Sequence, residues 1–498
     1  MTIGSGSHRR PIAPLIAFPV VISSLSYPSA GLVDPRQETQ ISTIRSAAEP
    51  LIQILERLRD RTARIGVIGL GYVGLTLASE FAGKFETFGF DVDVMRVAAI
   101  AAGRSYIGDV DSTLLAHLVT SGRFRATDDM SQLADCDCIV ICVPTPLGQS
   151  RRPDLSYILA ATRHIGAQLH RGQLVVLEST TYPGTTEEIL LPSFEAVGLA
   201  LDKDFLLAFS PERVDPGNKH YRIPDIPKIV GGCSVASTEA ATALYATIVH
   251  EVYPVSSARA AEAVKLWENT FRAVNIAMAN EMSLLCHKLR IDSNEVIDAA
   301  KTKPFGFMPF YPGPGIGGHC IPLDPHYLSW KAKQHGFHPR FIHVADEINS
   351  SMPAHVVELI GTTLNEQTKP LRNARVLVLG IAYKSDVNDI RESPALEIIK
   401  ILRDKHANVV YHDPHVPRLH LERSEPMIVR SRRVPANAPD DVLESVELTD
   451  AELTGADCVL VTTAHSDLDY ERIGALASTI VDTRHVFKGA TRARIVRL

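Results

Sequence analysis

Apolar and polar positions alternate along residues 64–177 in a way that predicts strands and helices in turn. Residues 64–68 form a short apolar run, and a glycine-rich turn and a helical segment ending near residue 81 follow it. Further apolar runs at residues 87–90, 138–143 and 174–177 have turn-forming residues behind them. Strands that alternate with helices form parallel, doubly wound sheets. We therefore expect an α/β domain here.

The C-terminal part of the chain repeats this pattern. An opening strand is predicted at residues 375–380, a helix at 394–403 and a second strand at 409–411. In both parts the second strand ends in an aspartate, Asp91 and Asp413, and an Ala-Asp pair leads a later strand. The general rules of α/β folds could by themselves produce this similarity, but the repeated pattern favours two Rossmann-like domains.

Helical segments separate the two sheet patterns. Residues 258–300 are rich in Ala, Glu, Leu and Met, and a second helical segment covers residues 330–364. The predicted fold class is α/β, with two Rossmann-like doubly wound domains joined by a central helical segment. The predicted boundaries are an N-terminal extension, without fixed order, over residues 1–60, a dinucleotide-binding domain over 61–257, a central region over 258–365 suited to dimerisation, and a second Rossmann-like domain over 366–498.

The composition narrows the class of protein. Of the 498 residues, 45% are hydrophobic and 22% are charged, as in ordinary globular proteins. The net charge of −6 gives no basic field, so we expect no nucleic-acid partner. Seven cysteines without a CxxC pair argue against a zinc site and favour a reducing, cytoplasmic location. Prolines interrupt the apolar run at residues 11–22, so we expect neither an export signal nor a membrane span.

A dinucleotide fingerprint follows the first strand. Gly69, Gly71 and Gly74 form GxGxxG between a strand and a helix, where the glycines permit a tight turn and close approach of a pyrophosphate. A structural turn is the alternative for such a motif taken alone. Asp91, 20 residues after Gly71, can bind the ribose hydroxyls and repel a 2′-phosphate. Together they predict NAD rather than NADP, with Arg96 as a candidate phosphate contact.

A second glycine-rich segment, residues 313–324, carries one cysteine. Cys320 lies between His319 and Asp324, after a run of glycines and prolines that lets the backbone approach a ligand. A lone cysteine is more often a small buried residue than a nucleophile. A thiolate nucleophile needs a lowered pKa or an adjacent base, and titratable neighbours supply that possibility. We therefore interpret Cys320 as a catalytic nucleophile.

Other polar residues could complete such a site. Lys265 and Asn269 are four residues apart and share one helix face, where they could donate hydrogen bonds to an oxyanion, although a solvated stripe would look the same. Glu212, in a turn-rich loop, is a candidate general base. Lys384, Arg391 and Arg484 follow strands of the C-terminal domain, where cations suit a diphosphate, but each alone is typical of a surface charge.

Six ordered motifs now point to one family. They are Gly-Leu-Gly-Tyr-Val-Gly-Leu, Val-Pro-Thr-Pro, Glu-Ser-Thr-Thr-Tyr-Pro-Gly-Thr, Ser-Pro-Glu-Arg, Lys-Leu-Trp-Glu-Asn and Gly-Gly-His-Cys-Ile-Pro-Leu-Asp. In this order they resemble the UDP-glucose/GDP-mannose dehydrogenase family, the nucleotide-sugar 6-dehydrogenases, over residues 64–486. The resemblance implies that the 6-hydroxyl of a nucleotide-linked sugar is oxidised to a carboxylate with two NAD⁺.

The resemblance also implies roles for individual residues. Cys320 matches the nucleophile that forms a thiohemiacetal and then a thioester, and Lys265 and Asn269 match the pair that stabilises the oxyanion. Asp324 and Thr180 match residues that activate and hold water, and Glu212 matches a base in thioester hydrolysis. The implied cofactor contacts are Gly69, Gly71, Tyr72, Val73, Gly74, Asp91, Arg96, Thr145 and Arg391. The implied substrate contacts are Glu212, Arg213, Lys265, Asn269, Gly317, Lys384 and Arg484.

The loops favour one branch of the family. The Ser-Pro-Glu-Arg-Val-Asp-Pro-Gly-Asn loop resembles enzymes of UDP-N-acetylhexosamines, and Arg213 replaces an aromatic residue of the UDP-glucose enzymes. We expect UDP-N-acetylglucosamine as the substrate, a product used for polysaccharide synthesis, and a homodimer or higher homo-oligomer. UDP-glucose or UDP-N-acetylmannosamine is the alternative substrate. A one-step dehydrogenase with a structural Cys320 and a non-catalytic nucleotide-sugar sensor are further alternatives.

Overall fold

The computed structural model describes residues 49–148, 152–214, 221–318, 320–421, 441–489 and 491–498. Most of the predicted N-terminal extension therefore lies outside the described residues, as does His319. Within the described ranges, no helix is both long enough and apolar enough to cross a membrane.

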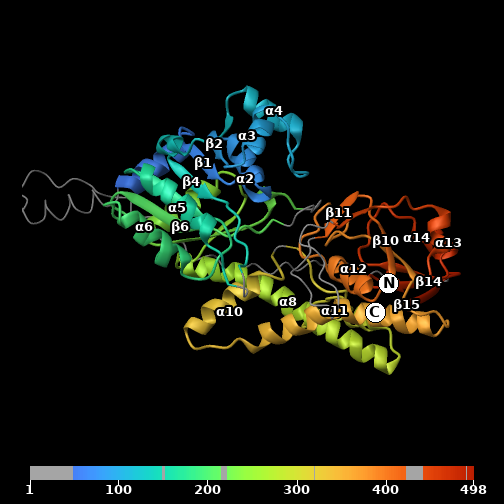
Figure 1. The fold of residues 1–498 in the computed structure, drawn as a ribbon. Coiled ribbons are helices and arrows are strands. Elements are labelled where there is room, and N and C mark those ends of the chain that lie inside the picture. Colours follow the sequence, from blue (N-terminus) through green and yellow to red (C-terminus); the bar gives the residue numbers. More distant parts are fainter. Residues whose placement is uncertain (1–48, 149–151, 215–220, 319, 422–440, 490) are drawn as a thin grey trace, which may run out of the picture. The chain divides into compact units, whose positions relative to one another are not determined.

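The first domain is built on an eight-stranded sheet with the order β3-β2-β1-β4-β5-β6-β7-β8. Figure 1 labels four of these strands, β1, β2, β4 and β6. The strands are β1 (Arg64–Ile68), β2 (Glu86–Phe90), β3 (Phe124–Thr127), β4 (Cys138–Ile141), β5 (Gln173–Leu177), β6 (Phe205–Phe209), β7 (Lys228–Gly232) and β8 (Val252–Pro254). Neighbouring strands run parallel except β6 and β7, which pair antiparallel. The doubly wound sheet predicted for this part is confirmed, and the reversed β7 is an addition to it.

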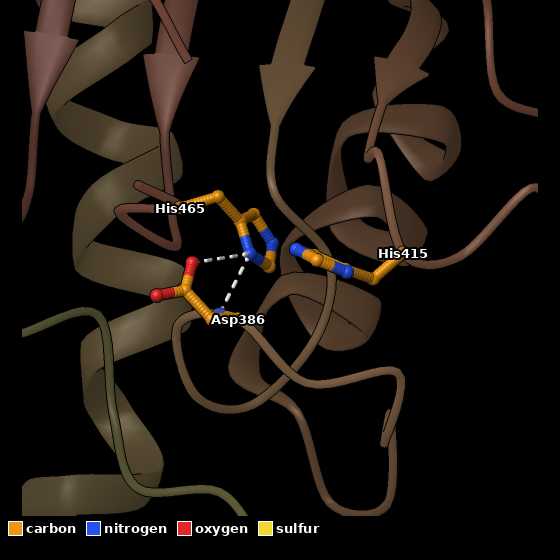
Figure 2. Close-up of side chains that lie close together, drawn as sticks. All are labelled: Asp386, His415 and His465. Atoms are coloured by element: carbon orange, nitrogen blue, oxygen red, sulfur yellow. Dashed lines mark hydrogen bonds and ion pairs between the residues drawn. The ribbon is translucent and has the colours of Figure 1, made fainter. Parts of the chain in front are cut away.

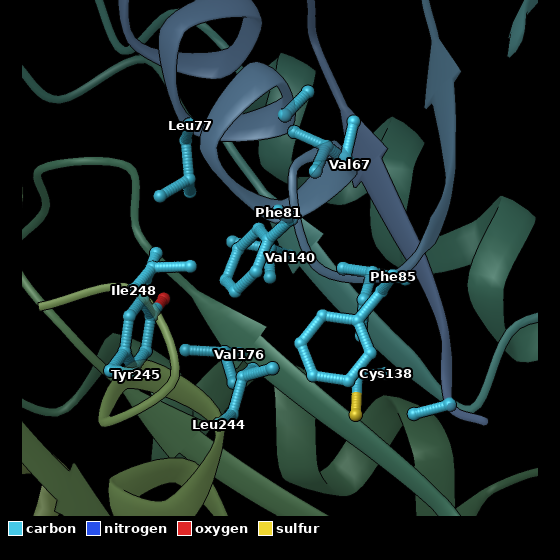
Figure 3. Packing of buried hydrophobic residues seen from close by; sticks show 14 of the residues in the cluster. Val67, Leu77, Phe81, Phe85, Cys138, Val140, Val176, Leu244, Tyr245 and Ile248 are labelled. Carbon is cyan, nitrogen blue, oxygen red and sulfur yellow. The ribbon is translucent and has the colours of Figure 1, made fainter. Parts of the chain in front are cut away.

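Helices cover this sheet and form its hydrophobic core. They are α2 (Tyr72–Ala82), α3 (Val94–Ala101), α4 (Ser112–Thr120), α5 (Ser156–Gln168), α6 (Leu191–Glu195) and α7 (Val235–Tyr245). Figure 3 shows Phe81 of α2 and Tyr245 of α7 packed over strand residues Val140 and Val176. Cys138 is fully buried in this core, as its apolar surroundings predict.

A further helix over residues 49–59 packs against the same domain. Its residues Ile54 and Leu58 belong to the core of the first domain. Arg57 forms an ion pair with Asp137, whose other carboxylate oxygen accepts the backbone N–H of Arg64 at the start of β1 (2.8 Å). Residues 49–59 are thus an ordered part of the first domain.

The central region consists of four helices, α8 (Ala258–Leu289), α9 (Ser293–Ala300), α10 (Asp324–Gln334) and α11 (Arg340–Asn365). The Ser257 side chain caps α8 by accepting the N–H of Ala260, and Arg290 ends the helix in the left-handed conformation. α8 and α11 pack side by side (Figure 1), and Asn349 of α11 donates to the Ala273 carbonyl oxygen of α8 (3.1 Å). The predicted central helical segment is confirmed.

The second domain has a parallel five-stranded sheet with the order β10-β9-β13-β14-β15. Its strands are β9 (Arg375–Leu379), β10 (Asn408–His412), β13 (Cys458–Val461), β14 (Thr479–Asp482) and β15 (Arg494–Arg497), and its helices are α12 (Pro394–Asp404), α13 (Asp450–Gly455) and α14 (Tyr470–Leu476). β11 (Arg418–Leu421) and β12 (Asp441–Glu444) form a separate antiparallel pair. The second Rossmann-like sheet is therefore also confirmed.

Candidate active site

The glycine-rich turn after β1 contains two kinds of glycine. Gly69 has φ +90°, and a Cβ there would lie 2.6 Å from the Cys142 carbonyl oxygen. A Cβ on Gly74 would overlap the carbonyl oxygen of Gly69, whereas a Cβ on Gly71 would meet no protein atom within 4 Å. The fold itself thus requires Gly69 and Gly74. Gly71 instead leaves open space at the N-terminus of α2, where backbone N–H groups can receive a phosphate.

The end of β2 completes this dinucleotide site. Asp91 Oδ2 accepts the backbone N–H of Leu70 (2.7 Å), which fixes the carboxylate beside the glycine turn, and the Arg96 guanidinium lies 3.3 Å from the same oxygen. The buried hydroxyl of Tyr72, next to Val73 in the first turn of α2, has no hydrogen-bond partner among the described residues. An orphaned buried hydroxyl and an open glycine turn fit a bound dinucleotide.

The loop that carries Cys320 is anchored through its glycines. The N–H of Gly313 donates to Asn280 Oδ1 of α8 (2.9 Å), and the N–H of Gly318 donates to the Arg391 carbonyl oxygen (2.9 Å). The loop is therefore tied both to the central helix and to the second domain. Cys320 is exposed at this loop, unlike the other described cysteines, which are buried or half-buried.

The central helix α8 brings polar side chains to this loop. Asn269 Nδ2 donates to Asp324 Oδ2 (2.6 Å), and Lys265 Nζ donates to the main-chain carbonyl oxygen of Glu212 (2.5 Å). Lys265 and Asn269 are both buried, so their common helix face is turned inward and is not a solvated stripe. The structure thus brings Lys265, Asn269, Asp324 and the Glu212 backbone together.

Asp324 has the properties of a base. It is the first residue of α10 and is buried. Burial raises the pKa of its carboxyl to about 6, although the Lys265 charge and the Asn269 hydrogen bond act in the opposite direction. A carboxylate with a pKa near 6 can accept a proton at neutral pH and release it again.

The Cys320 thiol is tuned by the same neighbours. Desolvation by the surrounding loop and the Asp324 carboxylate raise the pKa of the thiol above its usual range. The cations Lys265, Arg391 and Arg272 act against this rise. The thiol is therefore mostly protonated at neutral pH, and a nearby base has to remove its proton for nucleophilic attack.

A cavity of about 920 Å³ opens beside the cysteine loop. Thr270 of α8, Ile321 of the loop, Asn349 of α11 and Arg391 of the second domain are among the residues that line it. On the side of the first domain it reaches Pro146, next to Thr145, whose carbonyl oxygen accepts the hydroxyl of Tyr327 (2.7 Å). This bond ties the predicted cofactor contact Thr145 to α10, the helix that begins at Asp324.

The carboxylate of Glu212 points to a buried cluster that sequence reasoning missed. Lys228 Nζ forms ion pairs with Glu178 and with Glu212 Oε2 (3.2 Å). Lys228 and Glu178 are buried, and the Tyr245 hydroxyl donates to the second oxygen of Glu178 (2.6 Å). No sequence signal links these residues, because the reversal of β7 alone brings Lys228 to the end of β5 and β6.

Glu262 is a second residue missed from the sequence. It precedes Lys265 by three residues on the buried face of α8, a helical spacing that could have drawn attention to it. Its carboxylate accepts the N–H of Gly184 (2.5 Å) and both the N–H (2.8 Å) and the hydroxyl (2.6 Å) of Thr186. Burial raises its pKa to about 7. Glu262 therefore fixes the loop that follows β5, in which Thr180 lies.

The predicted cations of the second domain lie in different settings. Arg484 Nε donates to the Thr462 carbonyl oxygen (2.6 Å), and burial lowers the pKa of its guanidinium to about 10. A Cβ on Gly313 would lie 2.9 Å from the same guanidinium, so Arg484 reaches the cysteine loop. Arg391 is exposed and pairs with Asp389 (2.6 Å). Lys384 follows β9 at the carboxyl edge of the sheet.

Two further predicted substrate contacts are Gly317 and Arg213. A Cβ on Gly317 would lie 2.7 Å from the Cβ of Tyr383, so only glycine permits this approach. The Arg213 guanidinium binds Glu268 of α8 (2.7 Å) and the Pro227 carbonyl oxygen (2.6 Å). Arg213 thus spans from the Glu212 loop to α8, and its charge is compensated by Glu268.

Asp386, His415 and His465 form a cluster of possible metal ligands in the second domain (Figure 2). His465 Nδ1 accepts the Asp386 N–H (3.0 Å), and His465 Nε2 donates to Asp413 Oδ2 (3.1 Å). The His415 ring lies against the His465 ring, with centroids 4.9 Å apart and planes tilted by 46°. Because both nitrogens of His465 serve hydrogen bonds, the cluster acts as a brace between the ends of the strands.

Comparisons with known proteins identify the family. Three models of the UDP-glucose/GDP-mannose dehydrogenase family match, its NAD binding domain at residues 63–249, its central domain at 259–351 and its UDP binding domain at 377–489. The chain belongs to this family. The resemblance drawn from the six motifs is confirmed, and the chain is an NAD-dependent nucleotide-sugar 6-dehydrogenase.

Members of the dehydrogenase family from bacteria and archaea resemble it along most of their length. A UDP-N-acetyl-D-glucosamine 6-dehydrogenase from Pseudomonas aeruginosa is 37% identical over 71% of this chain and 83% of its own. A UDP-N-acetyl-D-mannosamine dehydrogenase from Pyrococcus horikoshii is 35% identical over 85% of this chain and 96% of its own. A solved structure of a UDP-D-ManNAc dehydrogenase from Pyrococcus horikoshii has a TM-score of 0.77 at 32% identity, covering 87% of this chain and 98% of that one.

Proposed function

We propose that this dehydrogenase oxidises C6 of a UDP-N-acetylhexosamine, UDP-N-acetylglucosamine before others, to the uronic acid. The observation that carries the catalytic part is the contact of Asn269 with Asp324 at 2.6 Å beside the exposed Cys320. The sugar is supported by relatives named for UDP-N-acetyl-D-glucosamine, 37% and 35% identical. The second Rossmann-like domain, residues 366–498, binds the UDP part, with Lys384 and Arg484 as its cations.

The first oxidation needs a base and a positioned alcohol. NAD⁺, when bound at the Gly71 turn and Asp91, supplies the acceptor for one hydride in each of the two oxidations. Asp324, through bound water, receives the proton of the 6-hydroxyl as the aldehyde forms, and releases this proton to solvent before the next step. The aldehyde carbon then lies within reach of the Cys320 sulfur.

The second oxidation runs on the cysteine. Cys320 sulfur bonds to the aldehyde carbon, its proton passes to Asp324, and the carbonyl oxygen becomes the oxyanion of a thiohemiacetal. Lys265 and Asn269 stabilise this oxyanion by charge and hydrogen bonding. Loss of a second hydride from carbon leaves a thioester. Asp324 releases the thiol proton to solvent, and water held by Thr180 then attacks the thioester while Asp324 takes one proton of this water. The C–S bond breaks, Cys320 leaves as a thiolate that regains a proton from Asp324, and the acid is the product.

Counting NADH formed per sugar consumed tests this proposal. Purified enzyme is given limiting UDP-N-acetylglucosamine, UDP-N-acetylmannosamine or UDP-glucose with excess NAD⁺. We expect two NADH per acetylated glucosamine derivative and a lower kcat/KM on the other sugars. One NADH per sugar would contradict the thioester pathway, and absence of turnover on all three sugars would contradict the assignment of the substrate to a UDP-N-acetylhexosamine.

UDP-N-acetylmannosamine is the second candidate substrate. It is favoured by the Pyrococcus horikoshii relative, which matches 85% of this chain, and by the solved structure with a TM-score of 0.77. The two sugars differ only in configuration at C2. A higher kcat/KM on the mannosamine derivative would move the assignment to this sugar and leave the catalytic residues unchanged.

We further propose that the enzyme is a homodimer formed through α8. Trp267, Phe271, Met278, Met282 and Leu289 lie at helical spacing along α8 and are exposed, so they form an apolar stripe. A stripe of this kind is unusual on a monomer and typical of an interface. Light scattering should give twice the chain mass, and Met278→Glu with Met282→Glu should give the single mass; a monomeric wild type would contradict this proposal.

A further inference from the structure

The reversed strand β7 brings a buried lysine into the active-site end of the first sheet. β6 and β7 pair antiparallel, with Phe209 opposite Gly231. Extending this pairing by three residues places Lys228, the first residue of β7, opposite Glu212. A parallel β7 would carry its first residue at the other edge of the sheet. The reversal therefore delivers one cation to the carboxyl ends of β5 and β6.

This lysine binds the side-chain carboxylate of Glu212. Lys228 Nζ contacts Glu212 Oε2 (3.2 Å) and forms an ion pair with Glu178. The other Glu212 oxygen accepts the N–H groups of Arg213 (2.6 Å) and Val214 (2.5 Å). Both carboxylate oxygens thus have hydrogen-bond partners other than Lys265, and Lys265 donates to the backbone carbonyl oxygen of Glu212.

The ionisation of the cluster agrees with this geometry. Burial, the largest influence on Glu212, would raise its pKa, but the Lys228 charge, a hydrogen bond with Glu178, the Val214 N–H and the Lys265 charge outweigh it and lower the pKa to about 2. Burial raises the pKa of Glu178 to about 7. The ion pairs raise the pKa of Lys228 although burial acts against them. Glu212 is therefore an anion and Lys228 a cation throughout the working range of pH.

The orientation of Glu212 decides how much charge Lys265 can offer. Lys265 Nζ is held by the Glu212 carbonyl oxygen at 2.5 Å, a dipole without net charge. If the Glu212 carboxylate turned to Lys265 instead, the ammonium charge would be neutralised at short range. Lys265 would then no longer act on the Asp324 carboxylate or the Cys320 thiol, the pKa values of which it lowers.

We propose that Lys228 is a positioning residue of the reaction. With Glu178 it holds the Glu212 carboxylate, so that Lys265 makes its hydrogen bond to the Glu212 carbonyl, forms no direct ion pair with the carboxylate, and keeps its charge for the oxyanion. The inference rests on the proposed role of Lys265. It assigns Glu212 a role through its backbone carbonyl, beside the catalytic role predicted for its carboxylate.

The experiment measures the pH dependence of Cys320 alkylation by iodoacetamide in the free enzyme, located by mass spectrometry of the Cys320 peptide. The charged groups that influence the thiol are Asp324, Lys265, Arg391 and Arg272, and all variants retain them. Lys228→Met should move the alkylation midpoint to higher pH by about half a unit or more, because a neutralised Lys265 no longer favours the thiolate.

Three further variants separate positioning from stability. Lys228→Arg should keep the wild-type midpoint. Lys228→Met combined with Glu212→Gln should restore it, because a neutral amide cannot neutralise Lys265. Lys331→Met removes another partly buried lysine, paired with Glu188 (2.6 Å), and should leave the midpoint unchanged.

Two results would overturn the proposal, a wild-type midpoint in folded Lys228→Met and a shift that Glu212→Gln fails to reverse. If Lys228→Met does not fold, Lys228→Met with Glu178→Gln removes both charges of the ion pair and should show the same upward shift.

In turnover, Lys228→Met should lower kcat about 100-fold, as for loss of an oxyanion donor, with the KM for NAD⁺ within about threefold. Alkylation needs neither sugar nor cofactor, so its outcome is independent of the NADH count that tests the proposed function.

Discussion

The two Rossmann-like domains share a backbone plan but use its key aspartate in opposite ways. In the first domain Gly69 N–H donates to the Phe90 carbonyl (2.7 Å), and in the second Gly380 N–H donates to the His412 carbonyl (2.9 Å). In each, the next N–H donates to the aspartate that ends the second strand. The divergence begins after this point, in what else the aspartate binds.

Asp413 is closed to any ligand. Its oxygens accept the N–H groups of Ile381 (2.6 Å), Ala382 (3.1 Å), His415 (2.8 Å) and Val416 (3.0 Å) and the His465 ring (3.1 Å). A carboxylate offers about four lone-pair sites, so Asp413 is saturated. Asp91 instead accepts the N–H groups of Leu70 and Asp93 and a hydrogen bond from the half-buried Arg96 guanidinium, which can move aside.

The turns after β1 and β9 also differ at their second glycine position, which is open in the first domain and filled in the second. Ala382 is two residues after Gly380, as Gly71 is two residues after Gly69, and Ala382 is fully buried with its N–H bound to Asp413. The comparison teaches that strand order and a terminal aspartate make a Rossmann-like frame, while an open glycine and an unsaturated carboxylate make a dinucleotide site. By this account NAD binds the first domain alone.

The strongest way to break the comparison is to remove the saturated aspartate. Asp413→Ala leaves buried N–H donors and His465 without their acceptor, and each such group costs about 1–3 kcal/mol. We expect a loss of about 4–5 kcal/mol in the free energy of unfolding, measured by denaturant titration. Asp91→Ala is the matched control and should lose about 2 kcal/mol or less. Equal losses of unfolding free energy in the two variants would show that the two aspartates contribute equally to stability, against the comparison.

The glycine turn gives the next largest effect. Gly74→Ala forces a Cβ onto the Gly69 carbonyl oxygen and should destabilise the protein by about 3 kcal/mol. Gly71→Ala meets no protein atom, so stability should change by less than about 1 kcal/mol while the Kd for NAD⁺ rises at least about tenfold. Thermal unfolding and calorimetric titration measure the two effects. An unchanged Kd in folded Gly71→Ala would mean that no phosphate approaches this turn.

Asp91 itself sharpens the comparison through binding. In Asp91→Ala the hydrogen bonds to the ribose are lost, and the Kd for NAD⁺ should rise about 10- to 100-fold, which is about 1.4–2.7 kcal/mol. Preference for NAD⁺ over NADP⁺ should fall at the same time, because the carboxylate that repels a 2′-phosphate is gone. Calorimetry with both cofactors measures this. Retained preference would place the selection elsewhere.

A third aspartate, Asp324, extends the comparison to catalysis, and the effect expected on the pH dependence of the rate is smaller than the effects on stability and binding. The pKa of Asp324 is raised to about 6 by burial, and the reaction needs its carboxylate form. The rate should therefore be full above pH 7 and fall about tenfold per unit below 6. Asn269 lowers the pKa of Asp324, so Asn269→Ala should move this limb to higher pH as well as lowering kcat. A pH–rate profile with an unmoved limb would remove Asp324 from the base role.

Much of the frame was predictable from the sequence, because strand and helix periods and the GxGxxG spacing are local signals. The apolar runs after residues 64 and 375 predicted both sheets, and the distance from Gly71 to Asp91 predicted the cofactor. The face shared by Lys265 and Asn269 followed from helical spacing, and the structure turns it toward Asp324.

The rest depends on contacts between distant segments. The Glu178–Lys228 pair requires the reversal of β7, which no local pattern announces. The saturation of Asp413 depends on His465, 52 residues away, so the sequence echo between the two domains could not show which one binds NAD. The ion pair of Arg213 with Glu268 likewise joins segments 55 residues apart, and the contact of Arg213 with the sugar stays a prediction.

Calorimetric counting of NAD⁺ sites per chain tests the central claim most directly. The account predicts one NAD⁺ site per chain in the wild type. Asp91→Ala should weaken the affinity of this site for NAD⁺ about 10- to 100-fold. His465→Gln removes a hydrogen bond in the second domain only and should leave the affinity at the wild-type value. Two equivalent sites per chain, or one site that survives Asp91→Ala unchanged, would contradict the assignment of the cofactor to the first domain.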